Sequence, residues 1–295
     1  MELINTTNPS NISNMDMDYC DAYCKMLLLA LYSVIFLVGT AGTIMISPMM
    51  FRRNSQSMIS TAVFNIVVLH SILLASLPFR LSYYLSGIWE LGYFTCRVVS
   101  AILYGHMYFT FIFYVAIVTL RLLIYFKKLQ MQPFQKYHAI MLSMAIWIVA
   151  GLIFLPIFFL QYGTDPSYSK KQRCFEFHRD LHHQGMVILN YSVIVVIMAT
   201  VLILFLLQMA VILQLMKAHW PDMWAHQEFR AQIKSFFFLL VIVVCFIPHH
   251  AFRVYFIDQY SGKESSKLVL YNEICLALTT VCCLDVPCFI GGIVR

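Results

Sequence analysis

Charged residues are scarce in this chain of 295 residues: they make up 12% of it, whereas hydrophobic residues make up 61%. A soluble domain typically holds about 25% charged and about 45–50% apolar residues. A soluble core of this length has too little interior volume to hide so much apolar surface. The excess of 20 basic over 14 acidic residues is small and diffuse, so no nucleic-acid partner is predicted. The composition instead indicates a polytopic membrane protein in contact with the lipid bilayer.

The signatures of several functional classes are also missing. The chain has no glycine-rich phosphate loop, no His-Glu-x-x-His motif and no exposed nucleophile beside a base, so no enzyme, cofactor or metal site is predicted. No internal repeat is visible, which disfavours a transporter built of two related halves. The last apolar segment contains no lysine for a retinal Schiff base, which excludes a retinal photoreceptor or a light-driven pump.

What the chain does have is a series of long apolar segments. A helix needs about 20 apolar residues to cross a hydrocarbon core about 30 Å thick, because it rises about 1.5 Å per residue. Segments that meet this requirement are 26–51, 58–81, 98–126, 137–160, 186–216, 235–257 and 268–294. The sequence therefore predicts an all-α membrane protein, a seven-transmembrane helix bundle.

Basic residues between the segments predict the orientation of the bundle. They gather in the breaks after the first, third and fifth segments, whereas the amino-terminal tail holds mostly acids, so the amino terminus is expected outside the cell. The break 161–185 is an exception, since it is basic although it would lie outside. Glycosylation acceptors at Asn5 and Asn11 support an extracellular tail. We therefore expect a glycosylated extracellular tail over residues 1–25 and a seven-helix domain over 26–294.

Two of the nine cysteines fall at positions that would be extracellular and close to span ends. These are Cys96, before the third segment, and Cys174, in the long break before the fifth. The oxidising exterior permits a disulfide between them. Closing so long a loop would stabilise the fold by about 4 kcal/mol in the chain-entropy model.

Several motifs occur in order along the predicted spans. They are Trp89-Glu90-Leu91-Gly92 before Cys96, Arg121 at the end of the third span, Trp147 and Pro156 in the fourth, Cys245-Phe246-Ile247-Pro248-His249-His250 with Arg253 in the sixth, and Asp285-Val286-Pro287-Cys288-Phe289 in the seventh. In this combination the chain resembles the rhodopsin-like G-protein-coupled receptors over almost its whole length. Three runs, Leu77-Pro78-Phe79-Arg80-Leu81, Ala225-His226-Gln227-Glu228-Phe229 and Tyr271-Asn272-Glu273-Ile274, are similar to an orphan member of that family. The resemblance implies a plasma-membrane receptor that couples an extracellular ligand to a heterotrimeric G protein.

The resemblance also assigns residues to an activation switch. Arg121 is implied to open toward the G protein, with Glu228 as its acidic partner at the base of the sixth helix. Pro248 removes a backbone hydrogen bond and bends that helix, and Phe246 is implied to report ligand occupancy to it. The remaining switch positions are His70, Asp285 and Phe289.

Two departures from the family pattern affect this switch. Leu120 replaces the acid beside Arg121, and His70 stands where the family has a buried Asp that holds a sodium ion. Imidazole is a poor ligand for sodium, so no sodium effect is expected, and His70 is placed to meet Asp285 directly. These departures leave open the alternative of a constitutively active or decoy protein without a diffusible agonist.

The resemblance further implies a ligand cavity in the outer half of the bundle. The residues expected to line it are Arg80, Tyr83, Tyr104, Tyr108, His249, His250, Arg253 and Tyr271. Arg80 and Arg253 predict an anionic ligand, because guanidinium binds carboxylate or phosphate through two parallel hydrogen bonds. The alternative is that these cations reach out to the lipid headgroups.

Overall fold

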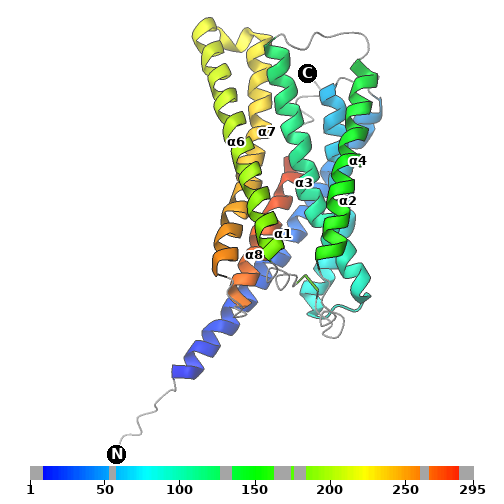
Figure 1. Cartoon of the computed structure of the whole chain (residues 1–295), viewed down its shortest axis with the longest axis vertical. Coiled ribbons are helices and arrows are strands. Elements are labelled where there is room, and N and C mark those ends of the chain that lie inside the picture. The colour runs from blue at the N-terminus through cyan, green and yellow to red at the C-terminus, as the bar shows by residue number, and fades with distance from the viewer. Residues whose placement is uncertain are drawn as a thin grey trace, which may run out of the picture.

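The structure is a computed structural model of the whole chain, and it describes residues 9–52, 58–126, 135–162, 174–175, 184–259 and 266–285. In these ranges the chain is helical and contains no strand (Figure 1). The elements are α1 (Pro9–Arg52), α2 (Met58–Ser86), α3 (Gly92–Tyr125), α4 (Gln135–Gln161), α6 (Gln184–His219), η2 (Met223–Ala225), α7 (Gln227–Gln259), α8 (Ser266–Leu278) and η3 (Thr279–Asp285). Seven stretches of helix are long and apolar enough to cross a membrane. The predicted seven-helix fold is therefore confirmed.

The helices extend beyond several of the predicted spans. α3 begins at Gly92, and α7 begins at Gln227, well before the predicted start of the sixth span at residue 235. The predicted break 217–234 thus consists of the end of α6, the short helix η2 and the first turns of α7. Hydropathy predicts only the part of a helix that lies in lipid, whereas the backbone hydrogen bonds continue into polar sequence.

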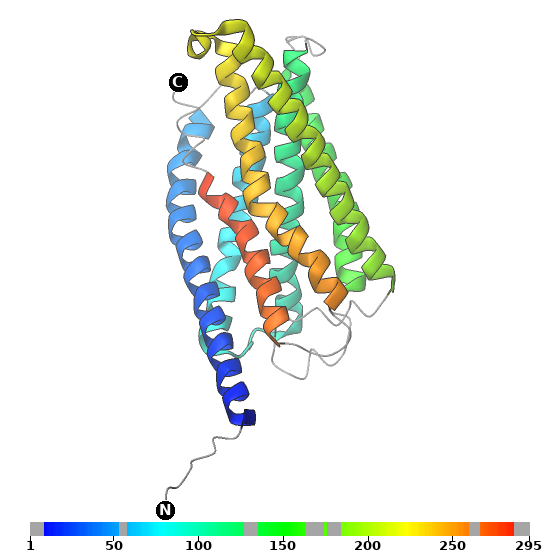
Figure 2. The same ribbon diagram turned by 90° about the vertical axis from the view of Figure 1, so that its left-hand side faces the viewer.

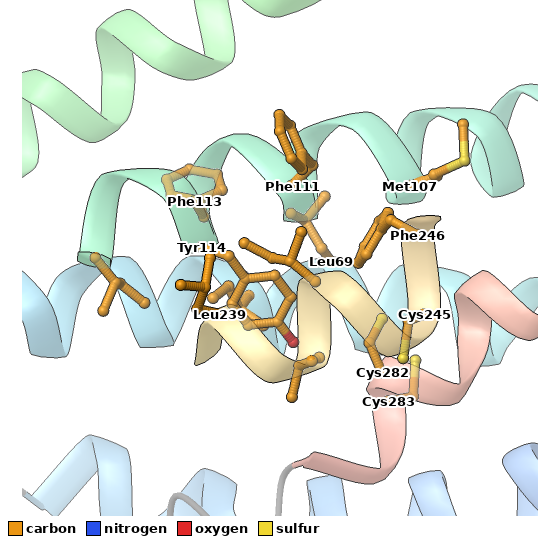
Figure 3. Close-up of a cluster of buried hydrophobic side chains, with 14 of the residues drawn as sticks. Leu69, Met107, Phe111, Phe113, Tyr114, Leu239, Cys245, Phe246, Cys282 and Cys283 are labelled. Atoms are coloured by element: carbon orange, nitrogen blue, oxygen red, sulfur yellow. The ribbon is translucent and has the colours of Figure 1, made fainter. Parts of the chain in front are cut away.

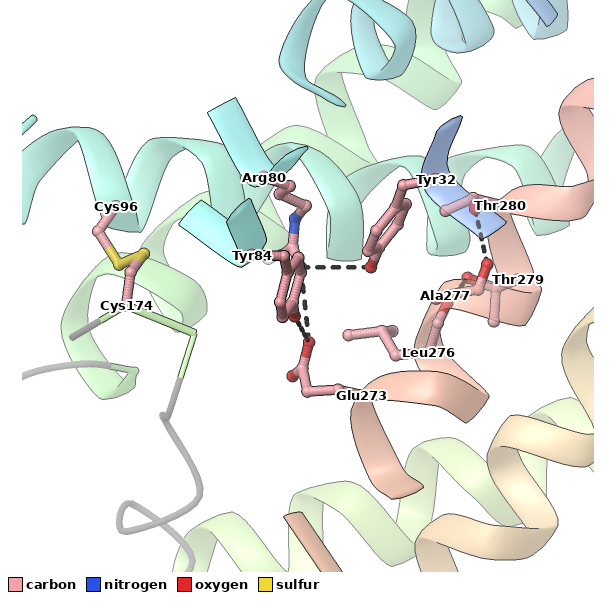
Figure 4. A network of polar contacts seen from close by, with 10 residues as sticks. All are labelled: Tyr32, Arg80, Tyr84, Cys96, Cys174, Glu273, Leu276, Ala277, Thr279 and Thr280. Atoms are coloured by element: carbon pink, nitrogen blue, oxygen red, sulfur yellow. Dashed lines mark hydrogen bonds and ion pairs between the residues drawn. A yellow bond between two sulfur atoms is a disulfide. The ribbon is translucent and has the colours of Figure 1, made fainter. Parts of the chain in front are cut away.

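The last span changes its helical form within the bundle. α8 ends at Leu278, and the chain continues as the 3₁₀ helix η3 (Thr279–Asp285). The Thr279 and Thr280 hydroxyls donate to the carbonyls of Leu276 and Ala277 at 2.7 and 2.6 Å (Figure 4). Such bonds compete with the α-helical ladder and favour the tighter form. The rest of the predicted segment, including Phe289 and the proline after Val286, lies outside the described residues.

α3 runs through the middle of the bundle and α4 lies at its edge. α3 contacts α2, α4, α6, α7 and η3 (Figures 1 and 2). Its buried side chains, such as Tyr114 and Ile117, belong to one continuous hydrophobic core. α4 exposes Ile148, Leu152 and Ile153. In a membrane protein such side chains face lipid, so their exposure does not indicate a docking surface.

α1 is longer than the predicted first span. It begins at Pro9 and projects beyond the other helices (Figure 1). Proline is well suited to the first helical position, because its missing N–H would have no partner there. The tail expected over residues 1–25 is therefore helical from Pro9 onward. Asn11 lies in the first turns of this helix, and Asn5 lies outside the described residues; glycosylation at both stays a prediction.

Candidate functional site

A disulfide joins the start of α3 to the connection before α6. The Cα atoms of Cys96 and Cys174 are 5.7 Å apart, and the predicted bridge is confirmed (Figure 4). We call this end of the bundle the disulfide end, and the opposite end, where Arg121 lies, the Arg121 end. The bridge positions Phe175, the residue that follows Cys174 in the chain.

Phe175 lies over the helix ends as part of an aromatic cluster. Its ring contacts Tyr83, Tyr84 and Trp89 at centroid distances of 5.3, 6.4 and 5.5 Å. Its φ of 71° lies in the left-handed region, which residues with a Cβ seldom adopt, so packing and the disulfide must hold it there. The sequence analysis missed Phe175, and its only signal was its place next to a predicted bridge. Tyr83, expected to line the ligand cavity, belongs to this cluster.

Arg80 is buried beneath Phe175, where its Nη1 has polar partners and its Nε has no hydrogen-bond partner among the described residues. The guanidinium carbon lies 4.0 Å from the centre of the Phe175 ring, and its nitrogen lies 3.5 Å from the Glu273 carboxylate and 3.4 Å from the Tyr32 hydroxyl (Figure 4). The Tyr84 hydroxyl donates to the same carboxylate at 3.5 Å. Arg80 and Glu273 are both buried. The charge of Arg80 is thus balanced within the protein, by a carboxylate on α8.

Arg253 on α7 is buried as well, but its hydrogen-bond partners are neutral. Its guanidinium donates to the amide oxygens of Asn190 on α6 and Asn272 on α8, each at 3.3 Å, and lies 5.2 Å from the Phe256 ring centre. Among the described residues, no carboxylate forms an ion pair with it. Within that part of the chain Arg253 thus forms no ion pair, although it attracts the Glu273 carboxylate at longer range, and an anion bound here would replace neutral amide oxygens with a charged acceptor.

Two histidines one turn before Arg253 also have polar atoms without partners. His249 Nδ1 and His250 Nε2 are buried and find no hydrogen-bond partner in the described part of the chain. The His250 ring lies 6.5 Å from the ring of Tyr108 on α3. Buried polar atoms are nearly always paired, so these two are candidates for contact with a bound molecule.

A cavity of about 230 Å³ lies between α3, α4 and α6. Most of its lining is apolar, and the polar exceptions are three tyrosine hydroxyls and the amide of Asn190. Its lining residues are Tyr104, Tyr108, Phe109, Ile112, Ala150, Ile153, Phe154, Ile157, Phe158, Tyr162, Leu189, Asn190 and Val193. Asn190 therefore links the cavity to Arg253. Of the predicted ligand residues, Tyr104 and Tyr108 line this cavity, whereas Tyr271 is 41% exposed on α8.

A second group of buried polar residues lies deeper in the bundle. His70 Nδ1 is 3.9 Å from the Asp285 carboxylate, so the two side chains do meet, and the Tyr114 hydroxyl donates to that carboxylate. Phe246 packs against Tyr114 and Phe111 at 6.4 and 6.2 Å (Figure 3). Four metal-ligating groups gather beside them, from His70, His106, Cys282 and Cys283. The sequence analysis predicted no such cluster, because its members come from three separate helices.

Comparison with known proteins identifies the bundle. A family profile described as "7 transmembrane receptor (rhodopsin family)" matches residues 41–288. This chain belongs to that receptor family. The resemblance indicated by the motifs is thus confirmed, and the protein is a multi-pass receptor of the plasma membrane.

Several curated receptors are similar to it along nearly the whole chain. Human probable G-protein coupled receptor 141 is 36% identical over 276 residues, which cover 92% of this receptor and 90% of the relative. This is the orphan receptor indicated by the three short sequence runs. Mouse probable G-protein coupled receptor 34 is 28% identical, with 95% of this chain and 77% of the relative covered. Mouse cysteinyl leukotriene receptor 2 is 25% identical, with 93% and 88% covered.

At the Arg121 end of this receptor, one expected contact is not made. Arg121 is half-buried, whereas Glu228 lies exposed in the first turn of α7, and no ion pair joins these two described residues. Near this end, a pair of buried amides joins α6 to α7. Gln208 Nε2 donates to the Gln232 backbone carbonyl at 3.0 Å and to its side-chain oxygen at 2.9 Å. The sequence analysis missed both glutamines. Gln208 lies within a predicted span, where a polar residue is a signal of function, whereas Gln232 fell in a predicted break.

Proposed function

We propose that this receptor binds an extracellular ligand with an anionic head and an apolar body, and converts that binding into activation of a heterotrimeric G protein. The observation that carries the proposal is Arg253, a buried guanidinium whose hydrogen-bond partners are neutral amides. In this proposal the protein is a receptor with no catalytic activity of its own, in keeping with the receptors it resembles.

The contrast between the two buried arginines assigns the anionic head to Arg253. Arg80 already has a carboxylate partner in Glu273, so an incoming anion would have to compete with a charge held in place by the fold. Among the described residues Arg253 forms no ion pair, so an incoming anion would have to displace only amide oxygens from it. Amide oxygens are weaker acceptors than carboxylate or phosphate oxygens, so exchange of an amide for an anion is favourable.

The cavity between α3, α4 and α6 suits the apolar body of the same ligand. Apolar lining with a few polar groups at one end is typical of ligand sites in proteins. Its volume of about 230 Å³ accommodates part of an alkyl chain, and Asn190 at its edge contacts Arg253. One of the relatives is named cysteinyl leukotriene receptor 2.

A route from this site to the Arg121 end passes along α7. His250 faces Tyr108 of the cavity wall, and Pro248 and Phe246 lie within one turn of it. Pro248 leaves a carbonyl of the helix without its usual partner, and α7 bends along its length (Figure 2). A bent helix can amplify a small shift near the ligand into a larger movement at the far end.

The test is a nucleotide-exchange assay on membranes that contain the receptor and a panel of G proteins. The probes are single-chain lipids with carboxylate or phosphate heads, and the same chains with amine or alcohol heads. We expect activation by acids only. Arg253→Gln should lower the potency of an active acid about tenfold to a hundredfold, since a hydrogen bond to a charged group is worth about 1.5–3 kcal/mol. The potency measured with Arg253→Lys should lie between those of wild type and Arg253→Gln, because lysine keeps the charge but lacks the two parallel N–H donors of guanidinium.

A matched pair of substitutions tests the cavity. Ala150→Phe places a ring in the cavity and should weaken the same acid, whereas Leu152→Phe adds the same ring on the 70% exposed side of α4 and should not. Activation by amines that is insensitive to Arg253→Gln would refute the proposal. The second candidate function is a constitutively active receptor, and the absence of an Arg121–Glu228 ion pair between these described residues is the observation behind it. Strong nucleotide exchange without any added lipid, unchanged across all these variants, would favour this candidate.

A further inference from the structure

Two histidines and two cysteines meet in the middle of the bundle. His70 lies on α2, His106 on α3, and Cys282 and Cys283 on η3. One nitrogen or sulfur atom of each lies within 4.8 Å of the corresponding atom of every other member. All four side chains are at most 2% exposed. We infer that this cluster is a zinc-binding site, which we call the His2Cys2 site.

The donor set is the one that structural zinc prefers. Zinc in such sites is held tetrahedrally by imidazole nitrogen at about 2.0–2.1 Å and thiolate sulfur at about 2.3 Å. Those bond lengths place neighbouring donor atoms about 3.3–3.8 Å apart. The observed separations are 3.9 Å from His70 Nε2 to Cys282 Sγ and 3.7 Å from His106 Nε2 to Cys283 Sγ. All six donor pairs lie within 4.8 Å, so side-chain rotations, with release of the Cys282 thiol from the Thr279 carbonyl, would complete the coordination sphere.

Charge balance favours a divalent ion at this depth. Two thiolates cancel the two charges of Zn²⁺, and the imidazoles remain neutral, so the site adds no net charge to the membrane interior. Hard ions such as sodium, calcium and magnesium prefer oxygen ligands, and the cluster offers none of its own. The nitrogen and sulfur donors of this cluster, which are poor ligands for sodium, thus suit a softer ion such as zinc.

The surroundings of His70 provide the outer contact that zinc-bound histidines commonly make. A ligating imidazole usually directs its second ring nitrogen at a carboxylate, which fixes the orientation of the ring. His70 Nδ1 lies 3.9 Å from Asp285 Oδ1, and within the described part of the chain neither atom has a hydrogen-bond partner. His106 Nδ1 is likewise buried and unpaired among the described residues. Coordination through Nε2 leaves Nδ1–H of His70 free to donate to Asp285.

An ion in the His2Cys2 site would join α2, α3 and η3 across the centre of the receptor. α3 carries the cavity residues Tyr104 and Tyr108 and, further along, Arg121, and the Cys282 sulfur lies near Cys245 of α7 (Figure 3). Zinc would therefore brace the bundle where its helices must move against one another. This inference concerns metal binding alone and does not depend on the ligand proposed above.

The experiment uses the full-length receptor, expressed in zinc-supplemented medium and purified through an epitope tag, so that no metal resin is involved. After a chelator wash, mass spectrometry measures zinc per chain. We expect stoichiometric zinc in wild type and in the control variant Cys275→Ala, whose thiol lies outside the cluster on α8. Cys282→Ala and Cys283→Ala should lose it. Zinc should also raise the unfolding temperature of wild type by about 5–10 °C.

Cobalt keeps the inference testable if a cysteine variant fails to fold. Wild-type receptor expressed with Co²⁺ in place of zinc should show the intense visible bands of tetrahedral cobalt and a thiolate-to-cobalt charge-transfer band. Loss of the charge-transfer band in Cys283→Ala supports the site. Wild-type protein with neither zinc nor these bands would overturn it, leaving only thiol–imidazole hydrogen bonds. Retention of zinc by both Cys282→Ala and Cys283→Ala would overturn it equally.

Discussion

Arg80 and Arg253 are both buried guanidinium groups on inward-facing helix positions, yet the fold gives them different tasks. Arg80 bridges α2 to α8 through Glu273 and supports the Phe175 ring of the disulfide-linked segment. Among the described residues, the hydrogen-bond partners of Arg253 are the side-chain amides of Asn190 and Asn272. Under the proposed function, Arg253 rather than Arg80 binds the anionic ligand, and Arg80 acts as a structural cation.

This division predicts that replacing Arg80 alone destabilises the fold, whereas replacing Arg80 and Glu273 together is tolerated. Arg80→Met should destabilise the receptor by about 3–5 kcal/mol, because it leaves the Glu273 carboxylate buried without its counter-charge. The double variant Arg80→Met/Glu273→Gln removes both charges and should recover most of that loss. Thermal unfolding of purified receptor measures both. If Arg80→Met were as stable as the double variant, the ion pair would not make this contribution to stability.

At the scale of elements, α6 and α7 are joined near the Arg121 end by a buried amide contact in place of an ion pair. Gln208 and Gln232 are at most 3% exposed. Two hydrogen bonds run from Gln208 to Gln232, one of them to the backbone of α7. Any outward swing of this end of α7 about Pro248 must break them, so they favour the conformation seen here.

We therefore predict that Gln208→Leu raises ligand-free G-protein activation. The loss of about 0.6–1.4 kcal/mol of this contact would increase basal nucleotide exchange about threefold to tenfold. Gln214→Leu, the same substitution at an exposed position of α6, serves as the control and should leave basal exchange unchanged. Equal basal exchange in the two variants would contradict the role assigned to this contact.

At the scale of the whole molecule, the orientation in the membrane remains a prediction from charge bias and glycosylation acceptors. The end of α1 that projects from the bundle lies at the disulfide end (Figures 1 and 2). Disulfides persist in oxidising surroundings, so this bridge independently favours placing that end, and hence the amino terminus, outside the cell.

The orientation predicts a measurable modification of the tail. Glycosidase treatment should increase the gel mobility of wild-type receptor, less so for Asn5→Gln or Asn11→Gln, and not at all for the double variant. An epitope fused to the amino terminus should bind antibody on intact cells, because the tail is expected outside. Antibody binding only after permeabilisation would reverse the orientation.

Much of the fold follows from one-dimensional patterns. Each apolar stretch must satisfy its own backbone hydrogen bonds in lipid, which is why hydropathy predicted all seven helices. Helix ends were predicted less well, because a helix can continue beyond the apolar segment that hydropathy detects. α7 begins at Gln227, eight residues before the expected start at 235. The change to 3₁₀ geometry at Thr279 depends on side-chain bonds that hydropathy does not register.

The amino-acid sequence by itself thus determined the class of protein, the number of spans, the disulfide and the receptor family, since these depend on composition, periodicity and ordered motifs. Only the tertiary structure decided which buried charges form an ion pair and which metal-ligating side chains lie close together. Asn190 and Arg253 are far apart in the chain, as are His70 and Cys282, and neither contact has a local signal. Helix packing brings such residues together. Packing depends on the rotation of each helix about its own axis, and the local sequence of an apolar segment, which faces lipid on one side and protein on the other, does not specify that rotation.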